Sequence, residues 1–201
     1  MDKEKILDKC VDLFFKYGIK SMSIDDISFH LSISKKTFYQ YFNNKDEVID
    51  EIIKQLLLKV QVTCTRIVEE NLDAPDKLIK IYSEIYCQFC NCAPRFFYDV
   101  QKFYPHIFQR LPDFWDCLYN LLETLIKQGK ESGVFTKEIN EEITIRLHQN
   151  VLRAIIEGIL IPKEDCTNST VFEIIIVNLI GISTIKGHKK LDKKLRMMSL
   201  K

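Results

Sequence analysis

The sequence lacks the glycine patterns and paired histidines that many nucleotide-dependent and metal-dependent enzymes carry. It contains no P-loop, no G-x-S-x-G or H-E-x-x-H motif and no dinucleotide-binding glycine pattern. Its four histidines are scattered over 201 residues, and its six glycines and five prolines form no linker-like run. We therefore expect no enzyme, no catalytic residue and no cofactor, and no flexible segment that would mark a domain border.

An excess of charge of one sign is lacking as well. The 29 Lys and Arg residues nearly balance the 28 Asp and Glu residues, which argues against a protein that coats nucleic acid but allows a locally basic surface. The N-terminus, MDKEKILDK, has no apolar core of the signal-peptide type, so we expect a cytoplasmic protein. The longest apolar tract, residues 171–185, is interrupted by Glu173 and Asn178 and predicts a buried helix, with no membrane partner.

Seven cysteines, without an export signal, predict reduced thiols rather than a disulfide framework. Cys87, Cys90 and Cys92 form a C-x2-C-x-C cluster, which a metal or redox site would use. In a continuous helix Cys92 would project away from the other two, and no second Cys/His pair has zinc-ligand spacing. The favoured interpretation is that these cysteines are small buried hydrophobic residues and that they form no metal site.

Residues 23–45, SIDDISFHLSISKKTFYQYFNNK, predict two short helices separated by a turn. Ser23 caps the first helix, and Asp26 completes a capping box with it. Ser34 caps the second helix. Two phenylalanines four positions apart in that helix would point inward together, Phe38 and Phe42. The side chains left facing outward are cationic, hydroxyl and amide groups, which reach phosphates and base edges in a major groove: Lys35, Lys36, Thr37, Tyr39 and Gln40.

The order of an apolar helix, a Tyr-Gly break, S-I-D-D-I, S-I-S-K-K-T-F-Y-Q-Y-F and N-K-D-E-V-I resembles the N-terminal DNA-binding domain of the tetracycline-repressor (TetR) family. The resemblance covers roughly residues 6–53 and is strongest over residues 34–45. It implies an all-α fold with a helix-turn-helix domain at residues 1–50. A long helix would join this domain to a helical ligand-binding and dimerisation domain at residues 51–201.

The resemblance also implies which residues contact DNA. Lys35 and Lys36 would approach base edges or flanking phosphates. Hydroxyl groups on Thr37, Tyr39 and Tyr41 would donate to phosphates. The full expected set is Ser23, Lys35, Lys36, Thr37, Tyr39, Gln40, Tyr41 and Lys45.

In that set, Ser23 would offer a backbone contact, Gln40 is a candidate adenine reader, and Lys45 would hold a phosphate at the start of the long helix. Two residues depart from the family pattern. Asp25 places negative charge where relatives often carry a polar or basic residue, and it would repel phosphate. Ser32 stands where the turn often has glycine, so we expect a strained or differently shaped turn.

Periodic apolar positions predict further helices over residues 3–17, 45–70, 74–93, 113–132, 140–160 and 169–185. Residues 95–111 contain a local excess of aromatic side chains, with Trp115 and Tyr119 soon after. A pocket for an apolar or planar effector and a well-filled core explain this excess equally well. The candidate ligand-binding residues are Phe89, Phe97, Phe103, Tyr104, Trp115 and Tyr119.

The last two predicted helices, at residues 140–160 and 169–185, are more apolar than one small domain can cover. In the TetR family the corresponding helices form a four-helix dimer interface, so the resemblance and the burial argument both predict a homodimer. The lysine-rich segment from Lys186 onward predicts a solvated, frayed end.

Taken together, the sequence predicts a homodimeric, ligand-responsive transcription regulator. It would act as a repressor that binds a palindromic operator in double-stranded DNA and responds to a small apolar or aromatic effector. Two alternatives stay open: a helical protein–protein adaptor that uses the apolar last helices, and a metal or redox sensor built on the cysteine cluster.

Overall fold

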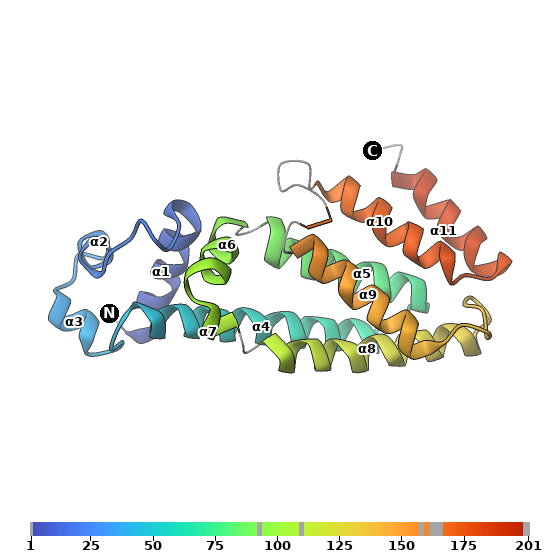
Figure 1. Cartoon of the computed structure of the whole chain (residues 1–201), viewed down its shortest axis with the longest axis horizontal. Helices are drawn as coiled ribbons and strands as arrows, with labels where there is room; N and C mark the ends of the chain where they lie inside the picture. The colour runs from blue at the N-terminus through green and yellow to red at the C-terminus, as the bar shows by residue number, and fades with distance from the viewer. Residues whose placement is uncertain (1, 92–93, 109–110, 157–158, 161–166, 199–201) are drawn as a thin grey trace. The chain divides into compact units, whose positions relative to one another are not determined.

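The computed structural model describes residues 2–91, 94–108, 111–156, 159–160 and 167–198. Over these ranges the chain is helical, with no strand beyond one isolated bridge between Phe135 and Ser183, which confirms the predicted all-α class (Figure 1). The helices are α1 (Lys3–Tyr17), α2 (Ile24–His30), α3 (Lys35–Tyr39), α4 (Lys45–Glu69), α5 (Ala74–Tyr86), a π-helical turn (Cys87–Asn91), α6 (Pro94–Phe103), α7 (Pro105–Phe108), α8 (Leu111–Glu131), α9 (Glu141–Ile156), α10 (Asn168–Gly181) and α11 (Ile185–Met198). Within the described ranges, none of them combines the length and apolar character needed to span a bilayer.

Contacts divide the chain into two compact units. Unit 1 comprises Met1–Lys59 and Asn91–Pro112, and unit 2 comprises Val60–Cys90 and Asp113–Lys201. The border expected near residue 50 falls inside α4, which is unbroken there. Contacts also assign α6 and α7 to unit 1, which the sequence did not suggest.

Aromatic packing explains why α6 belongs to unit 1. The Phe96 ring is fully buried and lies 6.5 Å from the Phe14 ring and 5.2 Å from the Phe15 ring of α1. Phe97 meets Phe96 edge-on at 5.4 Å. Two residues of the aromatic-rich segment, Phe96 and Phe97, are therefore part of the core of unit 1.

The local signals at the start of the chain are confirmed. Ser23 accepts a hydrogen bond from the Asp26 N–H and Asp26 accepts one from the Ser23 N–H, which completes the capping box of α2. Ser34 caps α3 by accepting from the Thr37 N–H at 3.0 Å. The inward pair is buried as expected, with Phe38 0% and Phe42 1% exposed.

Two side chains of opposite charge hold the loop between α1 and α2 in unit 1. The Lys45 Nζ donates to the carbonyls of Ile19 and Met22, each at 3.1 Å. An Asp99 carboxylate oxygen on α6 accepts from the Ile19 N–H at 2.7 Å and from the Lys20 N–H at 3.3 Å. We call this arrangement the loop clasp. Because the loop leads directly into the cap of α2, the clasp fixes where the helix-turn-helix segment begins.

The loop clasp is partly desolvated. Asp99 is only 6% exposed, and burial lowers the pKa of the Lys45 ammonium, opposed by the nearby charges of Asp46 and Asp99. The interaction replaces water around backbone groups that no helix satisfies.

In unit 2, α5 packs against α9 and α10, and α11 packs against α10 (Figure 1). The frayed end predicted from Lys186 onward is wrong for the described residues, because Ile185–Met198 form a helix with Leu191 buried. Lys186 donates to the Ser132 carbonyl at 2.8 Å, and Lys190 pairs with Asp73 at 2.5 Å. Two of the lysines that suggested a solvated tail therefore attach this helix to the rest of unit 2.

The core of unit 2 contains a stacked Tyr82–His148 pair between α5 and α9. The rings are 5.7 Å apart and 9° from parallel, and the Tyr82 hydroxyl lies 2.5 Å from His148 Nδ1. His148 is 3% exposed, and its Nε2 has no hydrogen-bond partner among the described residues. Burial lowers the pKa of His148 to about 4.

The loop clasp predicts a specific order of stability among Asp99 variants. Asp99→Ala leaves the Ile19 and Lys20 N–H groups without an acceptor, and we expect a loss of about 2 kcal/mol in the free energy of unfolding. Asp99→Asn keeps an acceptor oxygen at the same place and should lose less. Urea denaturation of both variants measures the difference, and equal losses would show that the acceptor role is not what holds the loop.

His148 predicts a pH-dependent stability of known sign. Its pKa in the folded chain, about 4, lies below the ordinary 6.5, so the unfolded chain binds more protons between these values and stability falls as pH falls. We expect the wild type to lose about 2 kcal/mol more than His148→Asn between pH 7 and pH 5. Asn does not titrate, so the other ionisable groups cancel in the comparison. The same loss in both proteins would contradict a buried, neutral His148.

Candidate nucleic-acid interface

The outward side of α3 presents the side chains that the sequence predicted for DNA contact. Lys35, Lys36 and Gln40 are exposed, and Tyr39 is 50% exposed. Thr37 and Tyr41 are half-buried. The burial of Phe38 and Phe42 beneath them leaves a short helix with a polar, partly cationic outer side.

Helix capping occupies the Thr37 hydroxyl, predicted as a phosphate donor, and both the hydroxyl and the N–H of Ser23, predicted to offer a backbone contact. The Ser23 hydroxyl lies 2.5 Å from an Asp26 carboxylate oxygen, and the Thr37 hydroxyl lies 2.8 Å from the Ser34 hydroxyl. A hydroxyl that donates within a cap still has acceptor capacity, but phosphate needs a donor. A phosphate contact by the Thr37 hydroxyl would require it to rotate away from Ser34, and a phosphate contact by the Ser23 N–H would compete with the Asp26 carboxylate.

Lys45 also has a structural use that the sequence did not reveal. Two of its three N–H donors point at the carbonyls of the loop clasp. One donor is left for a phosphate, so its expected DNA contact stays a prediction with a smaller capacity.

Asp25, expected to repel phosphate, forms an ion pair with Lys35. The Lys35 Nζ lies 2.5 Å from an Asp25 carboxylate oxygen, which joins the first turn of α2 to the first residue of α3. The hydrogen bond to Asp25 raises the pKa of the Lys35 ammonium. The pair was not foreseen, because its members are ten residues apart on different helices.

The turn between the two helices is strained, as the sequence predicted. Ser32 has φ of 53°, the only positive value at a residue other than glycine in the described part of the chain. A side chain in this region costs about 1–2 kcal/mol. The strained residue lies in the turn between α2 and α3.

Phe29 on α2 is an exposed aromatic side chain outside the predicted DNA-contacting set. Its side chain is 81% exposed, and it lies edge-on to His30, which stacks on Tyr17 at 5.9 Å. The signal was available, because Phe29 falls two positions after buried Ile27 and therefore off the apolar side of the helix.

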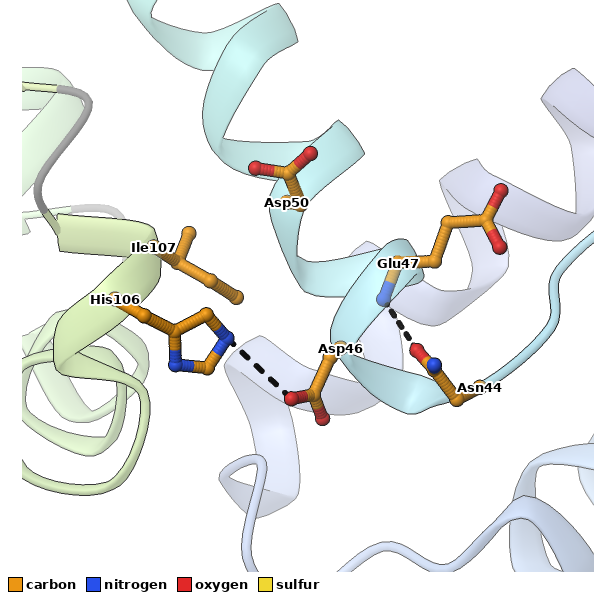
Figure 2. A pocket seen from close by; sticks show the side chains of 6 residues that line it. All are labelled: Asn44, Asp46, Glu47, Asp50, His106 and Ile107. Carbon is orange, nitrogen blue, oxygen red and sulfur yellow. Dashed lines mark hydrogen bonds and ion pairs between the residues drawn. The ribbon is translucent and has the colours of Figure 1, made fainter.

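A pocket of about 320 Å³ in unit 1 is lined by Asn44, Asp46, Glu47, Asp50, His106 and Ile107 (Figure 2). His106 Nε2 faces the Asp46 carboxylate at 3.4 Å, and the Asn44 side chain accepts from the Glu47 N–H at 2.8 Å. Three carboxylates make this pocket unsuitable for phosphate. No group of His, Cys, Asp and Glu among the described residues has the arrangement of a metal site.

The six candidate ligand-binding residues do not gather in one unit. Phe97, Phe103 and Tyr104 belong to unit 1, and Phe89, Trp115 and Tyr119 belong to unit 2. Phe103 lies under the Lys20 ammonium at 4.5 Å. Phe89 packs on Phe114 at 5.7 Å.

Trp115 contacts two polar side chains of α9. Its ring lies 4.9 Å from the Arg153 guanidinium, and its carbonyl accepts from the Gln149 side chain at 2.6 Å. Together with half-buried Tyr119, it remains a candidate lining residue within unit 2.

The cysteine cluster is only partly described. Cys92 and the side chain of Cys90 lie outside the described residues, and Cys87 begins a π-helical turn in which α-helical spacing does not apply. Elsewhere, burial raises the pKa of the Cys10 and Cys64 thiols to about 12. Those two thiols are poor nucleophiles, since reactivity follows the thiolate.

Comparison with known proteins supports the helix-turn-helix assignment. Residues 6–52 match the model of the bacterial regulatory proteins of the tetR family. The chain is 30% identical over 70 residues to an uncharacterized HTH-type transcriptional regulator, YhgD, of Bacillus subtilis, covering 35% of this chain and 37% of YhgD. It is 37% identical over 46 residues to the biofilm operon icaADBC HTH-type negative transcriptional regulator IcaR of Staphylococcus epidermidis, covering 23% and 25%. The matches span about a third and a quarter of these two relatives.

Solved structures extend the similarity in fold to nearly the whole chain. A TetR/AcrR family regulator from Thermobifida fusca has a TM-score of 0.70 at 14% identity, covering 88% of this chain and 96% of that one. The regulator FadR from Bacillus subtilis, in complex with stearoyl-CoA, has a TM-score of 0.64 at 14% identity, covering 87% and 97%. Residues 6–52 therefore match the helix-turn-helix segment of the tetR family of bacterial regulatory proteins, and the chain as a whole has a fold similar to that of these solved regulators.

Proposed function

We propose that the protein is a transcription regulator that binds double-stranded DNA in a sequence-specific way through α3. The observation that carries this proposal is the division of α3 and its following turn into a buried aromatic side and an exposed polar side. Such a helix can enter a major groove while its inward residues keep it fixed to the domain.

The exposed residues divide into two roles. Lys36 and Gln40 have side chains long enough to reach base edges, where Lys favours guanine and Gln favours adenine. Tyr39 donates its hydroxyl to a phosphate and so adds affinity without adding sequence information. Lys35, Tyr41 and the last donor of Lys45 would add phosphate contacts of the same kind.

The protein would act as a homodimer on a palindromic operator. Exposed apolar side chains on α9 and α10 support this: Ile143 is 67%, Leu147 53% and Val177 68% exposed in the single chain. Covering them with a second copy removes apolar surface from water. Two copies related by a twofold axis read two half-sites of opposite orientation.

Repression controlled by a small apolar effector is the regulatory mode we propose. IcaR, which matches the helix-turn-helix segment, is a negative regulator, and FadR, which shares the fold, is known in complex with stearoyl-CoA. An effector that binds unit 2 near Trp115 and Tyr119 would favour one separation of the two DNA-binding heads over the other, and so shift operator affinity.

Selection of genomic DNA by the purified protein at about physiological salt tests the function directly, because non-specific binding is suppressed there. We expect a palindrome with half-sites about one helical turn apart. On that operator, Tyr39→Ala should weaken binding about equally for all sequences. Lys36→Ala should cost about ten-fold and also relax the preference at one position per half-site.

Lys127→Ala is the matched control, since it removes one exposed lysine on α8 in unit 2, where Lys127 pairs with Glu123. It should leave the operator affinity and preference unchanged. If Tyr39→Ala and Lys36→Ala behave like this control, α3 is not the reading helix.

A further inference from the structure

The ion pair between Asp25 and Lys35 sits on the surface that the proposed function assigns to DNA. Its Nζ–Oδ1 distance is 2.5 Å, and the Lys35 and Asp25 side chains are 58% and 63% exposed. Lys36, next to Lys35, has no ion pair among the described residues. One of the two lysines at the start of α3 is thus neutralised by the chain itself.

Two other charged groups of this segment have structural partners. Asp26 is used by the capping box, and Lys45 by the loop clasp. Asp25 holds no helix cap and no backbone group in the described structure. Among the described residues its side chain pairs with Lys35.

An exposed ion pair of this kind is weak and exchangeable. Pairs between solvated side chains contribute about 0–1 kcal/mol, and salt screens them. A DNA phosphate approaching Lys35 would therefore displace Asp25 readily. The displaced carboxylate would then lie beside the phosphate that replaced it, and the repulsion between them opposes binding.

We propose that Asp25 is an internal competitor of DNA phosphate for Lys35, which lowers the affinity of the head for DNA of any sequence. This inference rests on the proposed function. Non-specific affinity is almost entirely electrostatic, so weakening one phosphate contact lowers it directly. Asp25 is then a residue that limits affinity for DNA without touching a base.

The salt dependence of binding isolates this effect. Each phosphate neutralised by a lysine steepens the slope of log K against log salt by about 0.9. In the wild type, the Asp25 carboxylate that the phosphate displaces regains a cation from solution, which offsets the ion release from the Lys35 contact. Asp25→Asn keeps the size of the side chain, removes its charge and should restore that contribution.

The test uses the full chain and a 30-base-pair duplex of random sequence as the probe, with binding followed by fluorescence anisotropy between 50 and 200 mM NaCl. We expect Asp25→Asn to steepen the slope by about 0.9, which corresponds to roughly eight-fold tighter binding at 0.1 M salt and roughly four-fold at 0.2 M. In a Lys35→Gln background, Asp25→Asn should leave the slope unchanged.

Asp12→Asn is the matched control. Asp12 is an exposed acid on α1 that pairs with Lys9 at 3.6 Å, so the substitution makes the same change in net charge within unit 1. It should leave the slope unchanged. Circular dichroism of each variant confirms that the helices are intact, and Asp25→Ser provides a second uncharged variant with a side chain that favours helix starts.

Three outcomes would overturn the proposal. The slope is unchanged in both Asp25 variants; or it steepens equally in Asp12→Asn; or it steepens equally without Lys35. Failure of the proposed function looks different, because then the wild type and every variant leave the duplex unbound even at 50 mM salt.

Discussion

The DNA-binding segment depends on how the chain satisfies the backbone of residues 19–22. This loop is too short to form its own hydrogen bonds throughout, and Ile19 is fully buried. The Lys45 ammonium satisfies two carbonyls and the Asp99 carboxylate satisfies two N–H groups. One of each charge is needed, since carbonyls require a donor and N–H groups an acceptor. The two charges also offset each other's desolvation.

The loop clasp explains why unit 1 is not a purely N-terminal domain. Asp99 lies on α6, some eighty residues beyond the loop it holds, and Phe96 on the same helix fills the core beside α1. A three-helix unit of about fifty residues has little apolar surface to bury. Phe96 and Phe97 of α6 enlarge that core, whereas Tyr98 and Phe103 on the same helix are exposed.

The sequence correctly predicted the features that depend on neighbouring residues. Caps at Ser23 and Ser34, the inward pair Phe38 and Phe42, and the strained turn at Ser32 each follow from residues within a few positions of one another. The sequence-based prediction was wrong where the structure of a segment depends on residues far away in the chain. The helix at Ile185–Met198 was missed, because its lysines find partners in other parts of unit 2 rather than in their own sequence neighbourhood. The division of the aromatic residues between two units was missed for the same reason.

Several of the acidic side chains in the N-terminal region accept hydrogen bonds from backbone N–H groups, as Asp99 does in the loop clasp. Residues 1–54 contain nine lysines and ten acids, an unusual balance for a DNA-binding head. Within these residues, Asp26 completes a cap and Glu47 accepts from the Asn43 N–H. Asp99 of α6, outside this range, likewise accepts from N–H groups of the loop. These carboxylates are satisfied by N–H groups of the chain and are oriented by them. The local potential at α3 therefore depends on which acids remain exposed there, and net charge is a poor guide to it.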